Sequence, residues 1–253
     1  MNLIISIKAE IIKTKRSASF WLSLLGAGVI PMIFFLAYII KPESGYSHTW
    51  HVHFLQGWQV SNAFLLRMFI ILICSLIPQI EYKNNAWKQV FASPQYIGNI
   101  FFSKYLTILI MVLFLFLAFN ILLILSAIVP NLFYSKFTFM SRSIDWAQVT
   151  RLNVKTFISL MAIISFQYWL SLRFRNFIVP IGIGLGLLVT ALILYQLQWE
   201  HISKVPYAFP VLTMERIQET KFKLENHELN SIGYFVFFTL LAFLDMRFRK
   251  ERG

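Results

Sequence analysis

Three histidines near one another are the group in this chain whose residue types most resemble a metal site. His48, His51 and His53 stand in the pattern H-x-x-H-x-H, and imidazole nitrogens are common ligands of transition metals. No clustered carboxylates lie beside them, and the single cysteine, Cys74, stands inside an apolar run. A plain interfacial loop with tryptophan anchors therefore explains this stretch more economically than a metal site does, and we expect no metal.

A lone arginine stands in the middle of a long apolar run. Arg67 follows the polar residues Gln59 and Asn62. A charge at this depth in a bilayer costs about 3 kcal/mol or more unless it is paired or hydrated. Two roles remain open. In the first, the three residues line a translocation path, where Arg67 meets an anionic part of a substrate. In the second, Arg67 pairs with Gln59, Asn62 or another span as a structural lock.

The motifs of common enzyme active sites are absent from the sequence. There is no G-x4-G-K-[ST] loop for ATP, no H-E-x-x-H and no G-x-S-x-G. Ionisable residues inside the apolar runs are nearly limited to Arg67, too few for a proton relay. We expect neither catalytic activity nor a cofactor, so any energy from ATP must come from a partner chain.

The longest polar break between apolar runs on the predicted cytoplasmic side covers residues 80–104, IEYKNNAWKQVFASPQYIGNIFFSK. Trp87, Val90, Phe91 and Pro94 recur at the spacing of one helix face, among lysine, asparagine and glutamine. This pattern predicts a short amphipathic helix at the membrane surface. A helix placed there can receive force from a soluble partner and pass it to the two spans that it joins.

In this stretch Glu81, Trp87, Pro94, Ser103 and Lys104 form the pattern E-x5-W-x6-P-x8-S-K. The pattern resembles that of ABC-2 type transporter permease subunits, especially the lantibiotic- and bacitracin-immunity branch. The resemblance implies that residues 80–104 are a coupling helix that docks on a separate ATPase subunit. The chain resembles the family in three further places: its N-terminal helix, the turn L-S-L-R-F-R-N, and an outer P-x3-P formed by Pro206 and Pro210.

Composition and hydropathy indicate a multi-span membrane protein. The chain has 253 residues, of which 58% are hydrophobic and only 13% charged, and its mean hydropathy is +0.65. Such values are far from those of a soluble domain. Six spans are predicted, at 20–40, 56–79, 105–129, 154–172, 177–196 and 232–246. The first run is too long for a cleavable signal peptide, and none is expected.

The basic residues give the expected orientation. The net charge of +12 reflects Lys and Arg at span ends, which also occur in an N-terminal amphipathic helix within residues 1–19. They are more concentrated in the segments predicted to lie inside, so both termini are expected in the cytoplasm. The fifth span carries Gly182, Gly184 and Gly186, and we expect Gly182 and Gly186 to form a small-xxx-small packing contact. The outer segment 205–214 is too short to span and is predicted to be re-entrant or interfacial.

The predicted fold class is therefore an all-α membrane protein with six transmembrane helices, in one permease domain over residues 1–253 with ABC-2 (type V exporter-like) architecture. The resemblance implies an exporter subunit in the cytoplasmic membrane, with Glu81, Trp87, Pro94 and Lys104 coupling it to an ABC ATPase. Its other expected partners are a second permease copy or paralogue and membrane lipid, with no nucleic acid. Immunity to membrane-active peptide antibiotics is the suggested role. A non-transporting scaffold or sensor and a small secondary transporter are the alternatives, although no internal repeat supports the latter.

Overall fold

The computed structural model describes residues 3–45, 48–83, 87, 89, 95–134, 137–217 and 223–248. Within these residues every regular element is helical, as the sequence predicted. Six of the described helices are long and apolar enough to cross a membrane: α2 (Ala18–Ile40), α4 (Leu65–Lys83), α6 (Ile97–Phe133), α7 (Trp146–Arg173), α8 (Ile178–Gln196) and α10 (Asn226–Phe248). They correspond in order to the six predicted spans.

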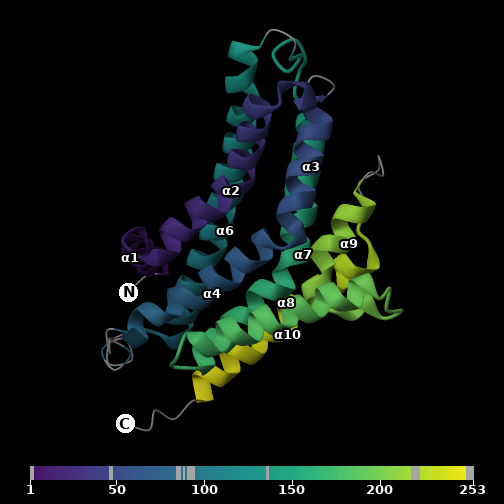
Figure 1. Ribbon diagram of the computed structural model, residues 1–253. Coiled ribbons are helices and arrows are strands. Elements are labelled where there is room, and N and C mark those ends of the chain that lie inside the picture. The colour runs from purple at the N-terminus through teal and green to yellow at the C-terminus, as the bar shows by residue number, and fades with distance from the viewer. Residues whose placement is uncertain are drawn as a thin grey trace.

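The second predicted span is two helices rather than one. The expected continuous span at 56–79 is divided at Phe64, with α3 (Trp50–Ala63) before it and α4 after it. Phe64 has φ −150° and ψ −52°, outside the helical region. A break at this depth frees backbone carbonyls that no bulk water can satisfy, so side chains must satisfy them. Figure 1 shows the change of direction between α3 and α4.

Helix α6 is much longer than the predicted third span. It contains 37 residues and is therefore about 55 Å long, against a hydrocarbon layer of about 30 Å. The extra turns come from residues 97–104, which the sequence assigned to the polar loop, and from Pro130 to Phe133. In Figure 1 α2 and α6 extend together, and α2 packs along α6.

The segment 205–214 forms a compact and largely buried element, and its re-entrant or interfacial position stays a prediction. It contains the short helices η3 (Pro206–Ala208) and α9 (Phe209–Arg216), preceded by η2 (Ile202–Lys204). Tyr207 and Phe209 are buried, and the element packs against α3, α7 and α8. Helix α9 ends at Arg216, and α10 begins at Asn226.

One glutamine joins four elements in the centre of the molecule. The Gln167 amide of α7 donates to Ser75 Oγ of α4 at 2.9 Å and to the Pro180 carbonyl of α8 at 2.6 Å. Its oxygen accepts a hydrogen bond from the Tyr207 hydroxyl at 3.0 Å. Gln167 is fully buried, so these bonds replace the water that it loses.

The glycines of α8 pack differently from the prediction. An added Cβ at Gly182 or Gly186 would meet nothing within 4 Å, so the expected contact of these two glycines is not formed within the chain. Gly184 is the packed residue, because its Cβ would lie 2.7 Å from Gln167 Oε1 and 2.8 Å from Ile71 Cγ2. The three glycines alternate along one apolar run, and nothing in that run marks which of them faces α4 and α7.

We predict that Gly184→Ala lowers the stability of the protein by about 1–3 kcal/mol, because overpacking displaces Gln167 and Ile71. Gly186→Ala is the matched control and should leave stability unchanged. The midpoint of thermal unfolding in mild detergent measures both. Equal midpoints for the two variants would contradict the packing assigned to Gly184.

Candidate functional site

The N-terminal helix α1 (Leu3–Lys15) turns its polar face toward the protein. Ser6, Glu10 and Thr14, spaced by one helical turn, are buried, whereas Ile4 and Ile12 are 60% and 66% exposed. The helix packs mainly along α6. The predicted amphipathic helix is therefore present. Its outward apolar face suits the membrane surface, and its inward polar face needs polar partners.

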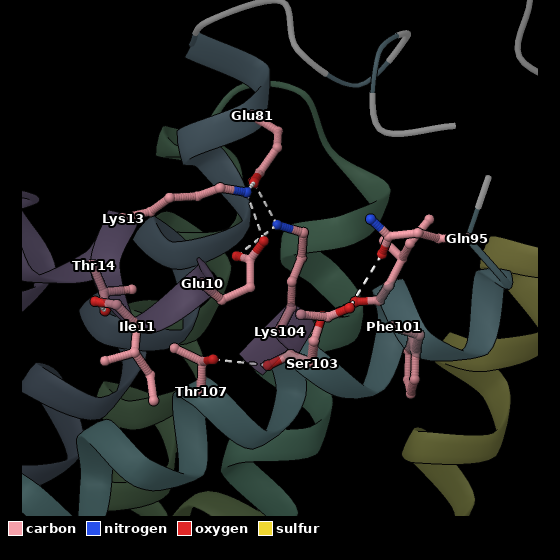
Figure 2. Close-up of polar contacts among 12 residues, drawn as sticks. Glu10, Ile11, Lys13, Thr14, Glu81, Gln95, Phe101, Ser103, Lys104 and Thr107 are labelled. Carbon is pink, nitrogen blue, oxygen red and sulfur yellow. Dashed lines mark hydrogen bonds and ion pairs between the residues drawn. The ribbon is translucent and has the colours of Figure 1, made fainter. Parts of the chain in front are cut away.

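Those partners are charged groups near the C-terminal end of α4 and the N-terminal end of α6. Figure 2 shows the ammonium groups of Lys13 and Lys104 between the carboxylates of Glu10 and Glu81. Lys104 Nζ lies 2.9 Å from Glu10 Oε2 and 2.5 Å from Glu81 Oε1. Lys13 Nζ lies 2.7 Å from Glu10 Oε1 and 3.1 Å from Glu81 Oε1. We call these four residues the charge cluster.

The charge cluster is shielded from water. The exposed fractions of Glu10, Glu81 and Lys104 are 6%, 2% and 1%, and the Lys13 side chain is the more open member. Burial acts to raise the pKa of Glu10, but the charges and hydrogen bonds of Lys104 and Lys13 outweigh it and hold that pKa below its ordinary value of 4.5. Removing one charge would leave the others buried without compensation.

The described part of the 80–104 segment packs onto the charge cluster. The Trp87 ring is buried, lies 5.2 Å from the Tyr82 ring, and has Lys104 Nζ 5.5 Å from its centre. This distance permits a cation–π attraction. Ser103 is buried on α6 and bonds the Ile100 carbonyl. Pro94 and most of the predicted coupling helix lie outside the described residues.

The same end of the bundle is joined to α7. Gln79 Nε2 donates to the Phe174 carbonyl at 3.0 Å, and the Tyr82 hydroxyl donates to the Leu172 carbonyl at 2.7 Å. The C-terminal end of α4 is thus held by α1 and α6 on one side and by the α7–α8 turn on the other.

Arg67 lies at the break between α3 and α4 and is fully buried. One guanidinium NH group donates to the carbonyl of Tyr207 at 2.7 Å, and the other donates to the carbonyl of Ala63, in the last turn of α3. Arg67 thus satisfies a carbonyl at the broken helix end and fixes η3 to it. This geometry fits the structural-lock alternative.

Comparison with protein families agrees with these features. A family model described as "ABC-2 family transporter protein" matches residues 6–191, which cover most of the chain. The chain belongs to the ABC-2 transporter family. It is a membrane transport component, and ATP hydrolysis in such systems falls to an associated ABC ATPase. No curated protein matches the chain in a sequence comparison.

In this ABC-2 protein, polar atoms near Arg67 are buried without a hydrogen-bond partner among the described residues: Arg67 Nε, Asn62 Oδ1 and Ser61 Oγ. The Asn62 amide nitrogen donates to the Trp58 carbonyl at 3.0 Å, and Gln59 is half-buried. Such atoms require water or a ligand. The place of Gln59, Asn62 and Arg67 on a translocation path stays a prediction.

The three histidines of the outer end do not converge. His48 Nδ1 and His53 Nδ1 lie 3.0 Å and 2.9 Å from the hydroxyl of Tyr38, which bridges them. His51 is exposed, and its carbonyl accepts a hydrogen bond from Gln148. Burial lowers the pKa of His48 and favours its neutral form. No group of three His, Cys, Asp or Glu within the described residues is arranged to hold a metal.

Sequence reasoning missed Glu10 and Lys13 as members of the site. The N-terminal stretch was interpreted through its isoleucines and basic residues, and its single acidic residue was overlooked. An isolated glutamate between lysines, one helical turn from Ser6 and Thr14, is the signal that marks the buried polar face.

We predict that acid destabilises the protein through Glu10. Because the pKa of Glu10 is lowered in the folded protein, its ionised carboxylate stabilises the fold. This stabilisation is fully present above pH 4.5, the ordinary pKa of the group, and it is lost as the pH falls through the lowered pKa. Glu10→Gln should cost roughly 3 kcal/mol at neutral pH and should reduce the pH dependence in this window. Thermal unfolding in detergent over a pH series tests this, with the exposed Glu43→Gln as control. Equal pH slopes for wild type and Glu10→Gln would rule out the assignment.

We predict that Arg67→Ala reduces the amount of folded protein in detergent, since two carbonyls lose their donors at about 1–3 kcal/mol each. Arg67→Lys should lie between wild type and Arg67→Ala, because an ammonium lacks the guanidinium fork. Gel filtration of detergent extracts measures the folded fraction, and Arg142→Ala, at an exposed arginine, is the control. A folded Arg67→Ala protein with lost transport would instead favour the translocation path.

Proposed function

We propose that this permease subunit acts in an exporter powered by a separate ABC ATPase, which engages the segment 80–104. The observation that carries the proposal is the charge cluster. Glu81 and Lys104 stand at the two flanks of that segment, and Glu10 joins them to α1. A push on the segment therefore acts on α1, α4 and α6 together.

The coupling residues differ in burial, and their proposed roles differ accordingly. Glu81 and Lys104 are too buried for their charges to serve as a docking surface. They hold the two flanks of the segment at a fixed separation, and Trp87 packs the segment onto them. Pro94 and its neighbours then belong to the part that meets the ATPase.

Two permease copies, or this chain and a paralogue, form the complete pathway with two ATPase subunits. ATP-driven closure of the ATPases presses both 80–104 segments and changes the access of the path between the copies. The concentration of Lys and Arg at the end of the bundle that carries α1 supports a cytoplasmic position for this end and for both termini. The cytoplasmic membrane is the proposed location.

The path passes the break between α3 and α4. The unpartnered atoms of Arg67, Asn62 and Ser61 supply polar groups at membrane depth, and Gln59 lies one turn earlier in α3. The bond from Arg67 to Ala63 holds the broken helix and the bond to Tyr207 holds η3, and its Nε remains to meet water or an anionic group. Structural support and lining of the path are then two roles of one side chain.

Membrane-active peptide antibiotics are the proposed cargo. This class rests on the resemblance of residues 81–104 to the lantibiotic- and bacitracin-immunity branch. Co-purification of the tagged chain from its native cells is the primary test. A P-loop ATPase should remain bound in mild detergent, and cells that lack the permease should be more sensitive to such peptides. A chain that purifies without any ATPase would favour the scaffold or secondary-transporter alternatives.

We predict that Glu81→Lys uncouples ATP hydrolysis from transport. The new ammonium lies beside Lys104 and Lys13, and their repulsion releases the flank of the segment. The ATPase should stay bound and hydrolyse ATP within about twofold of wild type, whereas peptide resistance should fall to that of cells without the permease. ATP turnover of the purified complex and growth inhibition of the same cells measure the two effects.

Membrane insertion of Glu81→Lys, checked in membrane fractions, should equal that of wild type. Glu43→Lys makes the same charge change at an exposed position in η1 (Pro42–Gly45) and should alter neither activity. Unchanged resistance in Glu81→Lys would remove the coupling role of the charge cluster.

A further inference from the structure

A second feature, far along the chain from the charge cluster, is a groove between α8 and α10. Its volume is about 790 Å³, and its floor is the last turns of α7. The walls are apolar, with Ile183 on α8 and Phe237, Leu240 and Leu244 on α10. These four side chains are between 37% and 57% exposed, so the groove is open along its side to the membrane.

One end of the groove is charged. Arg173 and Asp245 line it and form an ion pair of 2.8 Å. Arg175 and Arg247 are exposed and stand next in sequence to the lining residues Phe174 and Phe248. Three arginines therefore stand at or next to this end against the carboxylate of Asp245, which gives it a net positive charge.

The length of the groove corresponds to half a bilayer. Its lining residues on α10 extend from Phe237 to Phe248, a rise of about 16 Å along a helix. One leaflet of a bilayer contributes about 15 Å of hydrocarbon. The charged end coincides with the start of α8 and the end of α10, which lie together in Figure 1 and are the ends of two spans. An apolar groove of this length with a basic end at the membrane surface matches the shape and charge of a phospholipid.

We propose that this groove binds an anionic phospholipid, with one acyl chain between α8 and α10 and the phosphate at the arginine-rich end. Basic pockets between spans at a membrane surface are suited to anionic headgroups. The net positive charge selects an anionic lipid over a zwitterionic one. The lipid fills the space between two helices that both pack against α7, and it therefore stabilises the position of α8 relative to α10.

The chemistry of the groove favours a lipid over a span of a second copy. An apolar helix seated there would cover the walls but would bring no group for the guanidiniums at the end. A phosphate accepts hydrogen bonds from arginine in bidentate geometry, and Arg173 keeps Asp245 as its partner on the protein side.

Native mass spectrometry of the detergent-purified protein tests the proposal, with phosphatidylglycerol and phosphatidylcholine of identical acyl chains as probes. Phosphatidylglycerol adducts should survive at several times the level of phosphatidylcholine adducts. Arg173→Gln and Arg247→Gln should each weaken phosphatidylglycerol binding about fivefold, since one basic residue near an anionic surface contributes about 1 kcal/mol. Arg142→Gln, an exposed arginine in the loop before α7 at the other end of the bundle, should have no effect.

A second pair of variants separates the groove from general charge effects. Leu240→Trp fills the groove without changing charge and should abolish the preference for phosphatidylglycerol. Val236→Trp, equally exposed on α10 but outside the groove, should preserve it. Equal binding of both lipids, or equal losses in Arg142→Gln and Arg173→Gln, would overturn the proposal. Adducts on monomers that vanish on assembled dimers would also overturn it, because the groove would then belong to a subunit contact.

Discussion

An ammonium group that is withdrawn from water needs acceptors such as carboxylates to offset its lost hydration, and the end of the molecule that carries α1 depends on that pairing. Lys104 is 1% exposed and lies between Glu10 and Glu81. Its need for two partners draws α1 onto the ends of α4 and α6. Docking by the polar face leaves Ile4, Ile5 and Ile12 of α1 facing outward. One pairing requirement thus determines both how the helix binds the protein and which face it offers to lipid.

Buried polar groups among the spans also require partners. Where the backbone breaks between α3 and α4, Arg67 supplies donors to carbonyls of Ala63 and Tyr207. Where four elements meet, Gln167 uses its amide nitrogen and oxygen on α4, α8 and η3. Because lipid offers no hydrogen bonds, these polar side chains determine which apolar helices become neighbours. The packed glycine of α8, Gly184, then permits the close approach that the Gln167 bonds require.

The spans were predictable because each needs about 20 apolar residues, and such runs are visible without knowledge of the fold. Glu81 and Lys104 were also recognisable, since they belong to a local pattern. Glu10 was not recognised: its spacing with Ser6 and Thr14 marks a polar face, but nothing in the sequence identifies its partner Lys104, which is 94 positions away. Arg67 stood out as a charge in an apolar run, but its partners are backbone carbonyls, which every residue carries. The break at Phe64 was hidden for a similar reason, as the apolar run continues through it.

The length of α6 has a mechanical consequence. Lys104 lies near the N-terminal end of α6, a helix of 37 residues. If the helix tilts about the charge cluster, most of its length extends from that point as a lever arm. A tilt of about 5° about that end displaces the far end of a helix of about 55 Å by about 5 Å. In the proposed mechanism, a small displacement of the 80–104 segment by an ATPase would be amplified at the far end of α6. Because α2 packs along α6, it would follow this motion and stiffen the arm.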